Sequence, residues 1–89
     1  MKHFVQVGSF KKDYKRAQKR GKNIEKLSHI LATMLIDGEI PARHKLHKLT
    51  GNYAGHWELH IEPDWLLIFR YEGDAIILTR TGTHSDLFK

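Results

Sequence analysis

Residues 57–71 constrain the fold of this chain most, because they read as two consecutive strands separated by a break. From position 57 to 61 apolar and polar side chains alternate, which is the two-residue period of a strand with one buried face. Pro63 ends this pattern, since it has no amide hydrogen to donate to a neighbouring strand. Residues 65–71 are far more apolar and fit a central strand covered on both faces. The exposed face of the first strand is predicted to carry His56, Glu58, His60 and Glu62.

Residues 9–37 predict a helical hairpin. Ser9 is the expected cap of the first helix, Gly21 ends that helix, and Asn23 caps the second helix. Gly38 suits the left-handed residue that follows a helix. The apolar stripes that should face the core are Phe10, Tyr14 and Ala17 in the first helix and, in the second, Ile24, Leu27, Leu31, Met34 and Leu35, with Ile30 at the edge.

Strands are expected on both sides of these elements. Residues 3–7 predict a first strand, and a turn at 72–74 leads into a last strand at 75–81. Residues 38–55 read as a long polar connection that Leu46 and Leu49 pin to the core. The order β-α-α-β-β-β predicts a single α+β domain over residues 1–89, with the N-terminal helical hairpin on one face of a mainly antiparallel sheet.

Composition narrows the class of protein further. Eighty-nine residues leave room for one core only. The chain has no cysteine, so disulfides and thiolate metal sites are excluded and a reducing compartment is expected. The N-terminus lacks the apolar core of a signal peptide and no run approaches the length of a membrane span, which predicts a cytoplasmic protein without a membrane partner.

The net charge of +5 is unevenly distributed along the chain. Residues 1–36 carry nine Lys or Arg against two acids, whereas residues 52–89 carry three against six. A basic first third indicates contact with a polyanion or an acidic protein. The alternative is a solvated helix face with no partner. The basic side chains of the first helix are Lys11, Lys12, Lys15, Arg16, Lys19 and Arg20.

Seven histidines make acid–base chemistry the main candidate activity. Imidazole titrates near neutral pH, and RNA cleavage needs a base for the ribose 2′-hydroxyl, an acid for the leaving oxygen and a cation on the phosphate. These roles could be filled, without a metal or other cofactor, by His47, His60, His84, Asp64 and Arg80. The alternative is a set of scattered histidines that make ordinary hydrogen bonds.

A metal site would be the competing use of these histidines. His56 and His60 lie on the predicted strand, where a spacing of four residues separates their α-carbons by about 13 Å, too far for one zinc ion. His44 and His47 could share a metal only if their loop makes a helical turn. No bound metal is expected.

Several blocks of the sequence follow one another in the C-terminal half: His-Lys-Leu-Thr-Gly from position 47, Gly-His-Trp-Glu-Leu-His from position 55, Glu-Pro-Asp-Trp from position 62 and Arg-Thr-Gly-Thr-His from position 80, followed by Leu-Phe at 87 and 88. In this order they resemble YafQ-type toxins of the RelE/ParE superfamily of bacterial toxin–antitoxin systems. The resemblance implies a toxin that cleaves mRNA on the ribosome and is neutralised by an acidic antitoxin encoded in the same operon. It also implies a toxin–antitoxin complex of higher oligomeric order.

Carried over by position, the resemblance implies an active site in which the histidines are the acids and bases, Asp64 orients one of them, Arg80 binds phosphate and Phe88 stacks on a base. The full implied set is His47, His60, Asp64, Arg80, His84 and Phe88. Lys48 joins the basic residues of the first helix as an expected contact for ribosomal RNA.

Other interpretations of these residues stay open. Arg80 would pair with an acid across the sheet and Phe88 would fill the core if neither met RNA, while Trp65 is expected in the core in either case. The alternative functions are a non-enzymatic ParE-like inhibitor of a protein such as DNA gyrase, which does not need the C-terminal histidines, and a plain RNA-binding module.

Overall fold

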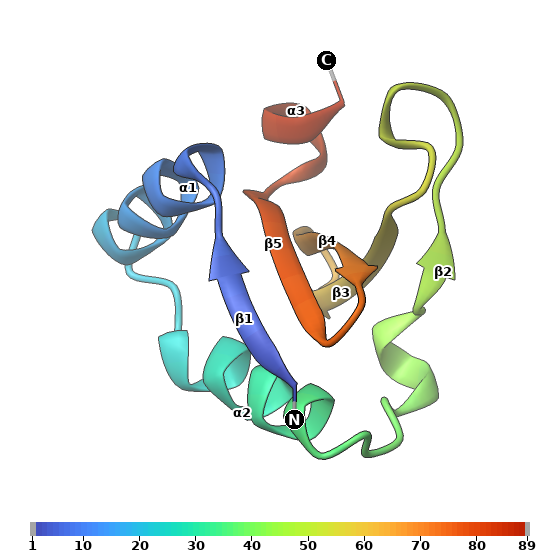
Figure 1. Ribbon diagram of the computed structural model, residues 1–89. Coiled ribbons are helices and arrows are strands. Elements are labelled where there is room, and N and C mark those ends of the chain that lie inside the picture. Colours follow the sequence, from blue (N-terminus) through green and yellow to red (C-terminus); the bar gives the residue numbers. More distant parts are fainter. Residues whose placement is uncertain (1, 89) are drawn as a thin grey trace.

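Five strands form one mixed sheet in the order β1-β5-β4-β3-β2 over residues 2–88, which are the residues that the computed structural model describes (Figure 1). Only β1 and β5 are parallel, and every other neighbouring pair is antiparallel. The predicted α+β class and mainly antiparallel sheet are therefore confirmed. The termini of the predicted domain, Met1 and Lys89, lie outside the described residues. In chain order the elements are β1 His3–Gln6, α1 Gly8–Lys19, α2 Ile24–Leu35, η1 Ala42–His44, β2 His47–Lys48, η2 Gly51–Tyr53, β3 Trp57–Glu62, β4 Trp65–Glu72, β5 Ala75–Gly82 and α3 His84–Leu87.

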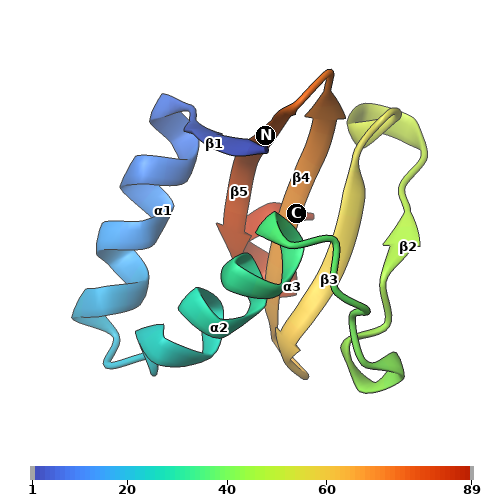
Figure 2. The same ribbon diagram turned by 60° about the horizontal axis from the view of Figure 1, so that its bottom comes forward.

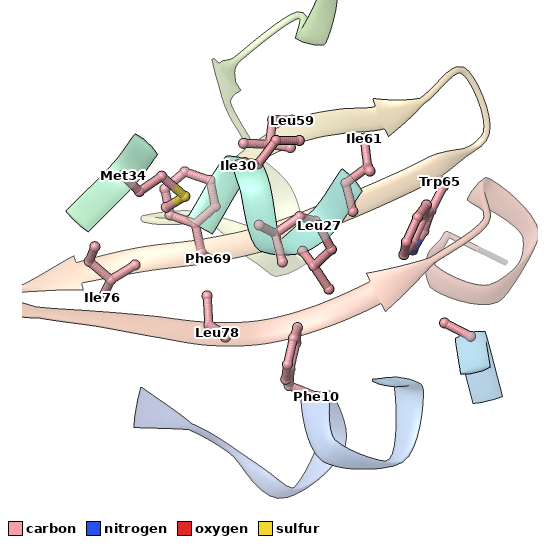
Figure 3. Packing of buried hydrophobic residues seen from close by; sticks show 12 residues of the cluster. Phe10, Leu27, Ile30, Met34, Leu59, Ile61, Trp65, Phe69, Ile76 and Leu78 are labelled. Atoms are coloured by element: carbon pink, nitrogen blue, oxygen red, sulfur yellow. The ribbon is translucent and has the colours of Figure 1, made fainter. Parts of the chain in front are cut away.

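The main core lies between the sheet and the helical hairpin. Figure 3 shows Phe10 of α1 and Leu27 of α2 pointing into the same apolar layer as Trp65 and Phe69 of β4. In a second view α2 lies across the sheet and α1 runs along its β5 side (Figure 2). Burying these side chains stabilises the fold by about 25 cal/mol per Å² of apolar surface. The predicted position of the hairpin on one face is confirmed.

The opposite face of β4 is covered as well. Leu66 and Ile68 are buried against Leu87 of α3, with Leu49 and Tyr53 packed beside them. This second layer explains why residues 65–69 are apolar on both sides, as the sequence predicts for a central strand. It also ties α3, which begins at His84, to the middle of the sheet.

The caps of the hairpin agree with the sequence in part. Asn23 caps α2, because its side-chain oxygen accepts the Glu25 amide hydrogen at 3.1 Å, and Gly21 after α1 has a positive φ of 77°. The prediction that Ser9 caps α1 is wrong, since the helix already begins at Gly8. The Ser9 hydroxyl instead donates to the Thr79 carbonyl of β5 at 2.7 Å.

The apolar stripe of α2 is rotated from the predicted one. Ile30, placed at the edge by the sequence, is buried together with Leu27 and Met34, whereas Leu35 is exposed. Leucines and isoleucines at successive positions make either register possible on periodicity alone. The contact with the sheet selects one register.

The end of α2 differs from the prediction. Asp37, and not Gly38, takes the left-handed conformation, with φ of 54°. Gly38 is needed for space, since a β-carbon there would lie 2.9 Å from Thr33 Cγ2 and 3.2 Å from the Thr33 carbonyl oxygen.

The connection at 38–55 has more structure than the sequence predicts. It contains η1, the two-residue strand β2 paired with β3, and η2. Leu49 packs on the second apolar layer as expected, but Leu46 is exposed and does not hold the loop. Among residues 2–88 no helix is long and apolar enough to cross a membrane.

Substitutions at Asp37 and Gly38 test which of these two residues has the left-handed conformation at the end of α2. Gly38→Ala should lower the free energy of unfolding by about 1–3 kcal/mol through overpacking against Thr33, which in a domain of this size lowers the melting temperature by several degrees. Asp37→Gly removes the left-handed penalty and should leave stability unchanged or raise it. The reverse ranking in thermal unfolding would show that position 38 is the left-handed one.

Candidate active site

The junction of β3 and β4 sets the position of the site. A register shift between His60 and Glu62 interrupts the ladder, and Pro63 and Asp64 form the turn before Trp65. The Pro63 carbonyl oxygen lies 3.2 Å from His60 Nδ1, so the turn itself orients the His60 ring. The predicted junction of two strands beside His60 and Asp64 is present.

Three of the predicted histidines form a row. The ring centroid of His60 lies 6.3 Å from that of His47 and 5.7 Å from that of His84. His47 comes from β2, His60 from β3 and His84 from the first turn of α3. The fold therefore brings together three titratable rings from distant parts of the chain.

Asp64 holds His84 at two points. Its Oδ1 atom accepts the His84 backbone amide hydrogen at 2.9 Å and lies 2.7 Å from His84 Nδ1. These bonds, the backbone one first, hold the pKa of Asp64 below its usual value, so the carboxylate is charged at neutral pH. Because a carboxylate can only accept, Nδ1 carries the hydrogen of this bond, and Nε2 is the ring nitrogen not used by Asp64.

A buried carboxylate lies under the other two histidines. Glu58 Oε1 is 3.4 Å from Nε2 of both His47 and His60, and the residue is only 4 % exposed. The sequence places Glu58 on a solvent-exposed strand face, which is wrong, because β2 and the histidine rings cover that face. The alternating pattern could not reveal this cover.

Arg80 lies on the part of β5 that extends beyond its pairing with β1, and its side chain binds Asp13 of α1. Its Nε donates to Asp13 Oδ2 at 2.6 Å and its Nη2 to Asp13 Oδ1 at 3.2 Å. The bond to Asp13 raises the pKa of Arg80 most, and the Tyr53 hydroxyl contributes further. The expected pairing of Arg80 with an acid thus occurs, but with a helix residue and not across the sheet.

The carboxylate of Asp86 attaches α3 to the C-terminal end of α1 through Arg16 and Arg20. Arg20 Nη1 donates to Asp86 Oδ2 at 2.7 Å, and Arg16 Nη2 lies 3.6 Å from the same oxygen. Asp86 also accepts the Thr83 amide hydrogen at 2.9 Å, and Thr83 Oγ1 accepts the Asp86 amide hydrogen at 3.1 Å, which closes a capping box. α3 presents His84, so these contacts set where that ring lies.

Phe88 stands at the rim of the site. It is 44 % exposed and does not fill the core. Its ring makes an edge-to-face contact with Tyr53 at 5.6 Å and lies 6.4 Å from the His84 ring. Trp65 is buried, as predicted, and donates its Nε1 hydrogen to Thr81 Oγ1 at 3.0 Å.

The basic residues predicted to contact RNA divide into arginines that bind carboxylates of the fold and lysines that are exposed. Arg16 and Arg20 are bound to carboxylates of the fold and are not a free solvated face. Lys48 is exposed and its Nζ lies 5.3 Å from the centre of the Trp57 ring. The exposed lysines of α1 are Lys11, Lys12, Lys15 and Lys19.

His44 and His47 each have one ring nitrogen close to a backbone carbonyl oxygen. His44 is buried with Nδ1 2.6 Å from the His60 carbonyl oxygen, and His47 Nδ1 is 2.6 Å from that of Lys45. The helical turn at 42–44 ends at His44, and His47 lies in β2, so no helical turn joins the two histidines. Over residues 2–88, no cluster of three or more His, Asp or Glu side chains could hold a metal ion.

Sequence reasoning missed three residues of this region: Asp13, Glu58 and Tyr53. Asp13 interrupts a helix that is otherwise basic and is 5 % exposed, so a lone acid at a core-facing position was the available signal. Glu58 had no signal beyond its place two residues before His60. Tyr53 had none, because the connection that carries it has no periodicity.

Comparison with known proteins decides the family. A sequence model described as the bacterial toxin of a type II toxin–antitoxin system, YafQ, matches residues 2–89. The chain belongs to this family. The resemblance noted in the sequence is thereby confirmed, and with it the toxin class.

Relatives in this family have solved structures and assigned names. The chain is 42 % identical over 83 residues to "mRNA interferase toxin YafQ" of Escherichia coli strain K12, covering 91 % of this chain and 89 % of the relative. The crystal structure of YafQ from E. coli strain BL21(DE3) superimposes with a TM-score of 0.93 at 34 % identity, over 100 % of both chains. YafQ in the E. coli DinJ–YafQ complex gives a TM-score of 0.91 at 36 % identity, again over 100 % of both chains.

Acid should loosen the attachment of α3 in this family member. The Arg20 hydrogen bond holds the pKa of Asp86 well below its usual value. A carboxyl whose pKa is lower in the folded state stabilises the fold while ionised, and this contribution is lost as the pH falls below about 4, the pKa of the unfolded chain, towards the folded value. Asp86→Asn should lower stability at pH 7 and flatten its fall between about pH 5 and 2, measured by urea unfolding.

The exposed acid Glu39 supplies the matched control. Glu39→Gln should retain the acid dependence of the parent. An Asp86→Asn variant with the same pH profile as the parent would show that this attachment does not contribute to stability.

Proposed function

We propose that this chain is the toxin of a type II toxin–antitoxin pair and acts as an endoribonuclease that cleaves mRNA on the ribosome, in the cytoplasm, by metal-independent general acid–base catalysis. The observation that carries the proposal is the row of His47, His60 and His84 with carboxylates behind it. The name mRNA interferase given to the E. coli relatives supports this activity over a ParE-like inhibitor or a plain RNA-binding module.

The reaction needs two proton transfers around one phosphorus atom. One histidine removes the proton of the ribose 2′-hydroxyl, whose oxygen attacks the adjacent phosphorus. The 5′-oxygen of the next nucleotide leaves and takes a proton from a second histidine. The products are a 2′,3′-cyclic phosphate and a free 5′-hydroxyl. Neighbouring rings at 5.7 Å, such as His60 and His84, span the distance between attacking and leaving oxygens.

The charges around the row suit this reaction. Each histidine that takes a proton becomes a cation, and Glu58 lies 3.4 Å from two of the rings while Asp64 lies 2.7 Å from the third. Arg80 has five N–H donors, of which Asp13 occupies two, and Tyr53 engages the same guanidinium, so donors remain for a phosphate oxygen. Phe88 exposes a face on which a base can stack.

Removing the His84 ring tests the mechanism. His84→Ala should lower cleavage by about 10²–10⁴-fold, which is the usual contribution of positioned proton transfer. Thermal stability and ribosome binding should change little, because the ring is exposed and Asp86 and Leu87 still hold α3. Mapping of mRNA ends in a translating extract measures the rate and shows whether the ends are 2′,3′-cyclic.

His29→Ala is the matched control, since His29 is an exposed ring on α2 outside the row. It should cleave like the parent, and EDTA should not slow either protein. Parental cleavage by both His84→Ala and His60→Ala, or loss of cleavage in EDTA, would overturn the mechanism.

We also propose that α1 lysines dock the toxin on ribosomal RNA. The triple change Lys12→Glu, Lys15→Glu and Lys19→Glu should weaken ribosome binding and reduce its salt dependence, by a slope of roughly 0.7–0.9 for each phosphate that is no longer neutralised. These side chains are exposed, so the fold should survive. Arg16 is left out because it binds Asp13 and Asp86. Sedimentation with ribosomes at several salt concentrations measures the effect, and an unchanged slope would assign these lysines to a solvated face.

The expected partner is an acidic antitoxin from the same operon, in a complex of higher oligomeric order. Support comes from the DinJ–YafQ complex of the E. coli relative and from the basic surface of this chain. A segment that folds on binding and covers α1 or the histidine row would neutralise the toxin.

A further inference from the structure

A cavity of about 490 Å³ opens directly beside the histidine row. It is lined by His60 and His84 of the row, by the cations Arg43 and Lys45, and by Ile61 and Pro63. Cavities of roughly 300–1,000 Å³ hold small ligands. Arg43 and Lys45 are not among the residues inferred from the sequence for contact with phosphate or base.

The free charge on this cavity is positive. Glu62 lines it, but its carboxylate is bound by Lys26 at 2.8 Å and by Lys22 at 3.4 Å, and these bonds, with Lys26 first, hold the pKa of Glu62 below its usual value. Within residues 2–88 no ion pair engages Arg43 or Lys45, and both are exposed. The site therefore attracts an anion.

The segment that carries Arg43 and Lys45 is attached to β3, the strand that carries His60. His44, between the two cations, is 9 % exposed and its Nδ1 lies 2.6 Å from the His60 carbonyl oxygen. Lys45 has a left-handed backbone, with φ of 49°, and its carbonyl oxygen lies 2.6 Å from His47 Nδ1. Arg43 and Lys45 are thus held in register with the histidines, as positioned binding groups require.

We propose that this cavity is a nucleotide subsite, in which Arg43 and Lys45 bind the phosphate next to the one that is cleaved, and the ribose or base contacts the exposed Pro63 beside the buried Ile61. The subsite rests on the proposed function, because the RNA strand is taken to cross the His60–His84 pair. Single-stranded RNA supplies both parts of such a ligand, with an anion on every nucleotide and an apolar ring face beside it.

Binding of a short RNA to a non-cleaving parent separates the subsite from catalysis. In the His84→Ala background, Arg43→Gln with Lys45→Gln should weaken binding of a fluorescent hexanucleotide by at least about tenfold and reduce the salt slope by about 0.7, which is the contribution of one single-strand phosphate contact. Fluorescence anisotropy at several salt concentrations measures both. In the same titration of the parent background, the Ile61 methyl resonances should shift.

Lys2→Gln with Arg70→Gln is the matched control, because it removes two cations that lie outside the cavity and outside the surface proposed to meet RNA. It should leave hexanucleotide binding close to that of the parent. An equal loss in the control, an unchanged slope in the Arg43 and Lys45 variant, or Ile61 resonances that do not move would each overturn the subsite. Cleavage by His84-containing protein is assayed separately, so a failed subsite and a failed nuclease give different results.

Discussion

The buried carboxylate of Asp13 is the interaction on which the arrangement of this site depends. β1 stops at Gln6, so the outer edge of β5 beyond it would expose unpaired backbone groups. α1 fills that edge with side chains: Ser9 donates to the Thr79 carbonyl, and Asp13 accepts the Thr81 amide hydrogen at 3.1 Å. The same carboxylate binds Arg80, so one residue completes the sheet and places the cation of the site.

The contacts of α1 extend from this edge of β5 to the C-terminal helix α3. Arg16 bridges Asp13 and Asp86, and Arg20 adds a direct bond to Asp86. Exposed ion pairs contribute little singly, but here they share two carboxylates that are mostly buried and hold a four-residue helix that could not form alone. The basic residues of this helical region thus divide by their contacts. Arg16 and Arg20 bind carboxylates of the fold, whereas the lysines of α1 are exposed to solvent.

Much of the fold followed from local patterns. The break at Pro63, the cap at Asn23 and the end of the first helix at Gly21 depend on a few neighbouring residues, and the structure has all three. The errors fall where tertiary contacts compete with local ones. Ser9 makes a bond to β5 in place of a cap, and Ile30 turns inward because of the sheet it meets. At the end of α2, Asp37 takes the left-handed conformation, and Gly38 instead lies close against Thr33.

For the site, the sequence by itself determined the chemical types: histidines near the strand junction, an aspartate after proline, and an arginine and an aromatic at the C-terminal end. Only the tertiary structure decided their partners. Asp64 binds His84 across 20 positions of sequence, Arg80 binds Asp13 across 67, and Glu58 is buried under rings from β2 and β3. Periodicity reports which face of its own element a residue occupies. It contains no information on which distant side chain will cover that face, because that depends on how the elements pack.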